Sequence, residues 1–344
     1  MAEKKKKPED NYQRFKKEIQ DRTLGRAYIL HGEESYLREY YLARAVEALV
    51  PPAFAAFNYH REEGIGVPRL AELLEAMPMM AERTVVEVRD WDLFKLNERQ
   101  RTELIALLSD LPDHCCLLLV YDLVAYAPNR TMRKLCKALE DHVVTVRFDV
   151  QDKRDLTNWV VRRFKAAGKE IGRQEVERLL LTCGSLMNAL IPEIEKIAAY
   201  AKGPRVTMED IDAVAAPVLA AQVFDMTGAV SRGDLDQAAE ILSGLLAARE
   251  EPIELLAAIG KELRRLYTAR IAIDNGWDRG WFMEQWSIRS DYVGRLLMQN
   301  ASQVTTGWCQ EALRRCQALD LRMKSVAGVD NSGELRQFLM ELGT

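Results

Sequence analysis

The first 150 residues alternate between two hydrophobic patterns. Short, continuous apolar runs are typical of strands that are buried on both faces of a sheet. Between these runs, apolar residues recur every three or four positions, which is the pattern of one face of a helix. Strands that alternate with helices predict a parallel sheet covered on both faces, and a wholly apolar run predicts its central strand. The predicted strands are 27–30, 54–59, 84–88, 115–121 (the central one) and 143–148, and the predicted helices are 11–20, 36–49, 68–77, 98–109 and 129–139.

The pattern becomes wholly helical near Val150. Gly168 is placed to cap the end of the first helix in this part, and Thr207 begins a capping sequence for a later, short one. Pro217 marks a further boundary, after which only helical periodicity is found. We therefore predict three domains, which are an α/β parallel-sheet domain at 1–149, a small helical domain at 150–215 and a helical bundle at 216–344.

The connection after the first strand is the first candidate for chemistry. Strand, glycine turn and helix form the frame of a phosphate-binding loop, which requires the pattern G-x-x-x-x-G-K-[ST]. Here Gly32 is followed by Glu33 and Glu34, then by Ser35 as a predicted N-cap, and the second glycine and the lysine are missing. Two carboxylates at this position would repel phosphates. Two interpretations stay open, a nucleotide-binding architecture that has lost its nucleotide and an ordinary strand-to-helix turn.

Other catalytic or metal-binding patterns are weak. Asp90 and Asp92 follow the third predicted strand and could hold magnesium, but a solvated strand end is expected without the loop lysine. The six cysteines form no C-x-x-C pair and mostly lie in apolar runs, as buried thiols in a reducing compartment do. No spacing suggests a nucleophile with its base. We expect no catalytic residue, no metal and no cofactor.

A methionine-rich connection precedes the third strand. Pro78 ends the preceding helix, so that Met77, Met79 and Met80 fall in a connection near one end of the sheet. Exposed methionines make adaptable apolar contacts with protein partners. Methionines buried under the loop are the alternative, and the sequence pattern alone slightly favours burial.

Charge and hydropathy exclude some classes of protein. The 344 residues carry a net charge of −4, whereas a strong free-standing nucleic-acid binder is usually basic. The lysine run Lys4–Lys7 is expected to be a solvated tail, with contact to nucleic acid as the alternative. No apolar run reaches the ~18 residues of a membrane span, and the N-terminus lacks the apolar core of a signal peptide. We expect a cytoplasmic protein that has no membrane contact.

Short motifs over nearly the whole chain resemble one known family. Residues 28–37 (YILHGEESYL) fit its opening pattern Y-x-L-x-G-x-(E/D)-x-x-L, and residues 76–86 (AMPMMAERTVV) fit its proline loop and the strand after it. In their order and spacing, these motifs resemble the delta subunit of the bacterial DNA polymerase III clamp loader. Further similarities lie at 156–159, 168–171, 184–196, 223–224, 233–234, 251–252, 264 and 319–324.

The resemblance implies an AAA+-like sheet domain, a small helical lid and a helical collar for oligomerisation. It implies a subunit that does not hydrolyse ATP and has no small-molecule substrate. Its partners would be the sliding clamp, the ATPase subunits gamma/tau, the delta-prime subunit and, through the assembled complex, primed DNA. It would bind the clamp and help to open the ring during DNA replication. The clamp-binding pair maps to Met79 and Met80 after Pro78, where the family often has Leu or Phe.

Two other classes of protein are kept as alternatives. The first is an active AAA+ ATPase that uses Asp90, Asp92 and an unrecognised nucleotide loop. The second is a stand-alone helical DNA-binding protein that uses Lys4–Lys7 and Arg264–Arg265. The missing lysine argues against the first alternative, and the acidic net charge argues against the second.

Overall fold

The computed structural model describes residues 11–343, so the lysine run Lys4–Lys7 lies outside the described residues. The chain divides into two compact units. The first unit extends to Val150 and includes the short segment Leu186–Asn188, and the second unit comprises Gln151–Ser185 and the chain from Ala189 onward. The division into three domains, with limits at 149 and 215, stays a prediction.

The first unit contains a five-stranded parallel sheet, as predicted. The strand order is β2-β3-β4-β1-β5, which places the wholly apolar strand β4 in the middle. Predicted strands at 27–30, 84–88, 115–121 and 143–148 are confirmed to within two residues. The strands are β1 (Ala27–His31), β2 (Tyr59–Glu63), β3 (Thr84–Arg89), β4 (Cys115–Val120) and β5 (Val144–Arg147).

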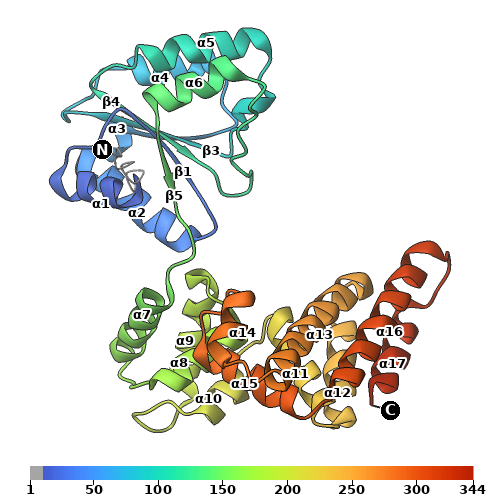
Figure 1. Ribbon diagram of the computed structural model, residues 1–344. Coiled ribbons are helices and arrows are strands. Elements are labelled where there is room, and N and C mark those ends of the chain that lie inside the picture. The colour runs from blue at the N-terminus through green and yellow to red at the C-terminus, as the bar shows by residue number, and fades with distance from the viewer. Residues whose placement is uncertain (1–10, 344) are drawn as a thin grey trace, which may run out of the picture. The chain divides into compact units, whose positions relative to one another are not determined.

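Helices cover both faces of this sheet (Figure 1). Alternate residues of β4 point to opposite faces, because side chains alternate along a strand. Leu117 and Leu119 belong to the core under α4 (Val67–Glu75), α5 (Glu98–Ser109) and α6 (Arg133–His142). Cys116 and Leu118 belong to the core under α1 (Asn11–Asp21) and α2 (Ser35–Leu49). The α/β fold class with helices on both faces is therefore confirmed.

Three details of the prediction are wrong. The expected strand at 54–59 is a 3-10 turn, η1 (Pro52–Phe54), followed by the short helix α3 (Ala55–Asn58). The strand at that point is β2, whose mostly polar residues lie at the edge of the sheet, so no apolar run marks it. Helix α6 begins at Arg133, four residues later than predicted. Ser35 is the first residue of α2, and the N-cap is Glu34.

The second unit is all-helical over its described residues, apart from one isolated bridge between Glu170 and Arg205. Gly168 follows the first helix at a φ of +73°, and the capping box at Thr207 is present, as predicted. The helices are α7 (Lys153–Ala166), α8 (Arg173–Cys183), α9 (Met187–Tyr200), α10 (Met208–Val214), α11 (Leu219–Ser231), α12 (Leu235–Ala247), α13 (Pro252–Asp274), α14 (Arg279–Gln285), α15 (Asp291–Ser302), α16 (Thr306–Ser325) and α17 (Asn331–Leu342).

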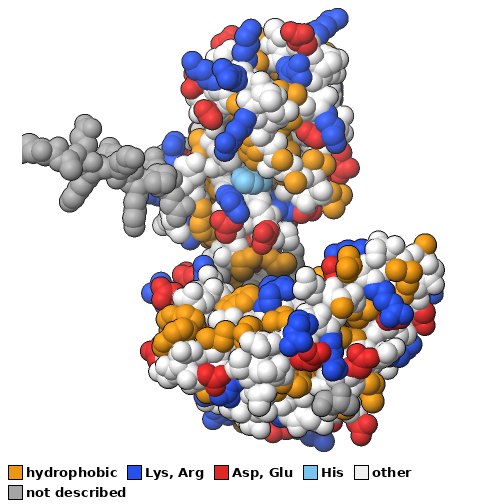
Figure 2. All heavy atoms as spheres, turned by 45° about the vertical axis from the view of Figure 1, so that its right-hand side comes forward, with side chains coloured by type: hydrophobic (Ala, Val, Ile, Leu, Met, Phe, Trp, Pro, Cys, Tyr) orange, Lys and Arg blue, Asp and Glu red, His pale blue; other side chains and the backbone are white. Residues whose placement is uncertain are grey.

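The surface carries charges of both signs. Figure 2 shows basic and acidic side chains interspersed over the face that it draws. Within residues 11–343, no single helix is long and apolar enough to cross a membrane. Taken together, α10 and α11 have the length and composition of a span, but the two helices are sharply bent relative to each other.

Candidate functional site

The glycine turn after β1 packs closely against the end of β5. Gly32 has a φ of +126°, and a Cβ atom at this position would lie 2.3 Å from the carbonyl oxygen of Phe148. The backbone N–H of Glu34 donates to that same carbonyl at 3.0 Å, and the N–H of Phe148 donates to His31 at 2.7 Å. The first of these bonds engages a backbone N–H of the turn, the kind of group that would face the phosphates in a phosphate-binding loop.

Charged side chains of the protein itself occupy this turn. Arg38, in the first turn of α2, is 1% exposed and donates from Nη1 to the Gly32 carbonyl at 2.9 Å. It also forms an ion pair with Asp122, which follows β4. The side chain of Glu34 is fully buried, and this burial raises the pKa of its carboxyl group. The turn thus contains one buried cation and one buried acid, in addition to its closed backbone.

A second charged network joins α2 to β3. Glu87 is fully buried in β3 and accepts hydrogen bonds from Tyr59 and Arg89. Arg89 also makes a bidentate ion pair with Glu39 of α2, at 2.9 and 2.7 Å. Burial and the bond to Glu87 raise the pKa of Tyr59. Sequence analysis did not identify this network, because its members come from three separate elements.

Asp90 and Asp92, the candidate magnesium ligands, accept hydrogen bonds from backbone N–H groups of the protein. Asp90 has a φ of +50°, and its Oδ1 accepts from the N–H groups of Asp122, Leu123 and Val124 at 2.8, 2.8 and 2.9 Å. Burial opposes ionisation of Asp90, but these three bonds outweigh it and lower its pKa. Asp92 caps η2 (Leu93–Lys95) by accepting from Phe94. Among residues 11–343, no three acidic, histidine or cysteine side chains are grouped to hold a metal.

The methionine connection is exposed. Met77, Met79 and Met80 are 74%, 57% and 80% exposed. Phe57 of the neighbouring helix α3 is 57% exposed, and it was not recognised from the sequence. Large apolar side chains at such exposure indicate contact with a protein or another apolar surface when they cluster. We call residues 77–80 the methionine loop.

A buried asparagine fixes the methionine loop. Asn58 at the end of α3 is fully buried and contacts both backbone polar groups of Met79. Its Oδ1 accepts from the Met79 N–H at 2.6 Å, and its Nδ2 donates to the Met79 carbonyl at 2.8 Å and to Phe54 at 2.9 Å. Met80 then follows at a φ of +56°, in the left-handed region that a non-glycine residue rarely adopts. The loop therefore holds its apolar side chains outward in one backbone conformation.

Comparisons with known proteins agree with the family resemblance. The profile of "DNA polymerase III, delta subunit" matches residues 28–149, and that of "DNA polymerase III delta subunit, C-terminal domain" matches residues 220–342. The DNA polymerase III subunit delta of Bacillus subtilis (strain 168) is 24% identical over 324 residues, which is 92% of each chain. A probable DNA polymerase III subunit delta of Aquifex aeolicus (strain VF5) is 23% identical over 78% of this chain and 77% of its own.

Solved structures were compared as well. The DNA clamp loader delta protein of Bacillus subtilis has a TM-score of 0.49 and 20% identity, with 96% of this chain and 99% of that chain covered. A DNA polymerase III gamma-subunit-related protein of Thermotoga maritima has a TM-score of 0.40 and 14% identity, with 97% and 99% covered.

The family profiles assign this chain, which has a parallel α/β domain with a closed glycine turn and a helical second unit, to the clamp-loader class. The two family profiles cover well over half of the chain and match it at both ends. The chain belongs to the family of DNA polymerase III delta subunits, which are clamp-loader components that act in DNA replication.

Proposed function

We propose that this delta-family chain binds the sliding clamp through its methionine loop and helps to open the ring for loading onto primed DNA. The observation that carries the proposal is the exposure of Met79 and Met80, which is 57% and 80%. Asn58 fixes the backbone of this pair, because its side chain is hydrogen-bonded to both the N–H and the carbonyl of Met79. The pair stands at the position where the family often carries Leu or Phe, which gives the same apolar chemistry.

Burial of this pair would contribute part of the free energy of docking. Fully burying one methionine side chain contributes about 1.5–3 kcal/mol. Methionine loses more rotamer entropy on binding than Leu or Phe, which offsets part of this gain. A backbone already held in one conformation reduces the remaining cost, because loop ordering is a major cost of association. Phe57, on the adjacent helix α3, adds apolar area beside the loop.

Ring opening follows from differential binding. A ligand shifts an equilibrium between closed and open rings only by the difference between its affinities for the two states. The chain would therefore need to fit the clamp subunit better in the open ring. No covalent bond changes in this step, and the chain itself needs no nucleotide for it.

The absence of ATP hydrolysis by this subunit is part of the proposal. The backbone of the turn at Gly32 is hydrogen-bonded to Phe148, at the end of β5. Glu34 stands where a phosphate would lie. Arg38 donates a hydrogen bond to the Gly32 carbonyl and forms an ion pair with Asp122. The proposed energy source is therefore ATP bound by the partner subunits gamma/tau.

Assembly with gamma/tau and delta-prime is assigned in this proposal to the helical collar at 216–344, with 150–215 as the lid. The helical second unit supports this assignment, since exposed apolar side chains such as Leu321 and Met340 remain on α16 and α17.

The experiment for clamp binding is the double substitution Met79→Ala/Met80→Ala. We expect clamp affinity to fall by roughly 100-fold or more, because two lost anchors remove about 3 kcal/mol and each ~1.4 kcal/mol is a factor of ten. The melting temperature should not change, since exposed substitutions usually stay within about ±0.5 kcal/mol.

Leu123→Ala is the matched control for this experiment. Leu123 is 90% exposed in the same unit, so its replacement by alanine removes a comparable apolar side chain away from the methionine loop. Its clamp affinity should equal that of the unsubstituted chain. Unchanged affinity in the methionine variant, or equal losses in both variants, would remove the methionine loop as the docking element.

A further inference from the structure

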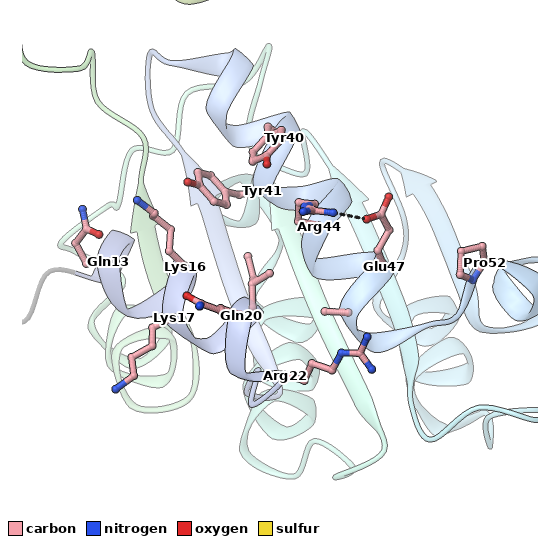
Figure 3. Close-up of a pocket in the computed structure, with 12 residues that line it drawn as sticks. Gln13, Lys16, Lys17, Gln20, Arg22, Tyr40, Tyr41, Arg44, Glu47 and Pro52 are labelled. Atoms are coloured by element: carbon pink, nitrogen blue, oxygen red, sulfur yellow. Dashed lines mark hydrogen bonds and ion pairs between the residues drawn. The ribbon is translucent and has the colours of Figure 1, made fainter. Parts of the chain in front are cut away.

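A basic groove of about 820 Å³ lies on the first unit between α1 and α2. Figure 3 shows side chains of both helices facing this groove. The groove is on the sheet face opposite to α5, because α1 and α2 pack on the other core. Four basic side chains line it, together with a single carboxylate, Glu47: they are Lys16, Lys17, Arg22 and Arg44.

Helix α1 is firmly attached to the sheet, so the backbone positions that carry its basic side chains are fixed. Phe15 is fully buried in the core. The side-chain amide of Asn11 donates to the Thr145 carbonyl at 2.8 Å, and the Tyr28 hydroxyl donates to Glu18 at 2.6 Å. The groove is therefore a formed surface and not a gap beside a loose terminal helix.

Aromatic rings are interleaved with the cations. The Nζ atom of Lys16 lies 5.2 Å from the ring centroid of Tyr12 and 5.7 Å from that of Tyr41. The guanidinium group of Arg44 lies 6.0 Å from the ring centroid of Tyr40 and 3.2 Å from Glu47. Tyr40 is 46% exposed, so part of its ring is open to a ligand.

Three of the cations are not neutralised by a carboxylate. Among residues 11–343, Lys16, Lys17 and Arg22 have no ion-pair partner, and the groove's single carboxylate is engaged by Arg44. Arg22 follows α1 at a φ of +56°, a helix-end position that favours glycine. The chain thus carries an arginine at a conformationally unfavourable position on the rim of the groove.

We propose that this α1–α2 groove binds single-stranded nucleic acid. Unpaired cations attract the phosphate backbone, and an exposed aromatic ring stacks an unpaired base, which is the combination used by single-strand binders. A base within a duplex is already stacked and would not reach Tyr40. Since the whole chain carries a net charge of −4, the attraction for the strand would be local to the cations of the groove. This site is independent of the proposed clamp docking.

The test is fluorescence anisotropy of a labelled oligothymidylate with the full chain, over a series of salt concentrations. The substitutions Lys17→Gln/Arg22→Gly remove two of the three unpaired cations, and glycine suits the backbone at position 22. We expect about a tenfold loss of affinity and a log–log salt slope shallower by about 1.4, since each phosphate contact to a single strand contributes ~0.7. Tyr40→Ala should weaken binding about tenfold with an unchanged slope, because stacking is not a charge effect.

The matched control is Lys95→Gln/Arg99→Gln, which removes two cations that lie before and on α5. Both side chains are more than 80% exposed, and affinity should change less than twofold. The clamp-docking variant Met79→Ala/Met80→Ala should bind the oligonucleotide normally, and the groove variants should bind the clamp normally. The proposal is overturned if binding does not depend on salt, if the control loses as much affinity, or if an acidic glutamate peptide occupies the groove while the oligonucleotide does not.

Discussion

At the scale of single residues, Asn58 is predicted to affect the proposed docking site although it does not belong to the exposed surface. Its side-chain amide satisfies the N–H and the carbonyl of Met79, and it is fully buried while it does so. Leaving buried polar groups unpaired costs about 1–3 kcal/mol. The residue therefore couples the stability of the first unit to the conformation of the methionine loop.

The substitution Asn58→Ala should lower both stability and clamp affinity. Thermal unfolding should report a lower melting temperature, and clamp binding should weaken because the loop loses its fixed conformation. The control is a double-mutant cycle with Met79→Ala/Met80→Ala. In that background, Asn58→Ala should still lower the melting temperature but should cost no further clamp affinity. If clamp affinity falls by the same factor in both backgrounds, Asn58 does not act through the loop.

Glu34 gives a prediction about pH. Its folded pKa is raised, chiefly by burial, so the folded state binds more protons than the unfolded state between the unfolded and folded pKa values. Stability therefore falls as pH rises through this window. Glu34→Gln removes the buried charge, and we expect it to raise the melting temperature at neutral pH. The gain should shrink as pH falls toward the ordinary glutamate pKa of ~4.3. A gain that is constant from pH 4 to 8 would contradict this account.

At the scale of elements, the unit formed by β1, the glycine turn and α2 is predicted to bind no ATP. The backbone N–H of Glu34, in its turn, donates to the carbonyl of Phe148 at the end of β5, and Arg38 donates to the Gly32 carbonyl. Calorimetric titration of the isolated chain with ATP and magnesium should give no binding heat at micromolar concentrations. A clamp-loader ATPase subunit, titrated under the same conditions, is the positive control. Micromolar binding by this chain would contradict the non-catalytic assignment.

Elements marked by a strong apolar pattern could be predicted from the sequence. Strands β3 and β4 and helix α5 were found because burial on both faces, or on one helical face, imposes a period on the residues. Strand β2 was missed because an edge strand needs no such pattern. The positions of Pro78, Met79 and Met80 were predicted, but the sequence pattern alone slightly favours burial of the methionines.

Long-range polar contacts could not be predicted in the same way. Asn58 lies 21 positions from Met79, and Arg38 lies 84 positions from Asp122. A single polar residue in one sequence does not specify which distant backbone group it will satisfy. The proposed docking pair thus came from the family resemblance, whereas the residues that hold its loop and fill the glycine turn required the structure.

At the scale of the whole molecule, clamp docking and assembly with the loader subunits are predicted to be separable. The methionine loop belongs to the first unit, and the proposed collar belongs to the second. A substitution in either surface should therefore affect only the function of that surface. On the collar, Leu321 of α16 and Met340 of α17 are 67% and 53% exposed and offer apolar area for a helical interface.

The substitutions Leu321→Glu/Met340→Glu should block assembly with gamma/tau and delta-prime and leave clamp affinity unchanged. Two carboxylates in an apolar interface would have to be desolvated without a partner, which costs far more than the lost apolar contacts. On the free chain the same changes should be nearly neutral, since both positions are exposed helix sites.

Met79→Ala/Met80→Ala should show the reverse result, with normal assembly and lost clamp binding. Size-exclusion chromatography of the reconstituted loader and clamp affinity, measured on both variants, would distinguish the functions. If the glutamate variant still assembles with its partners, the interface does not include this surface of α16 and α17. If either variant loses both functions while its melting temperature is unchanged, the two units do not act independently.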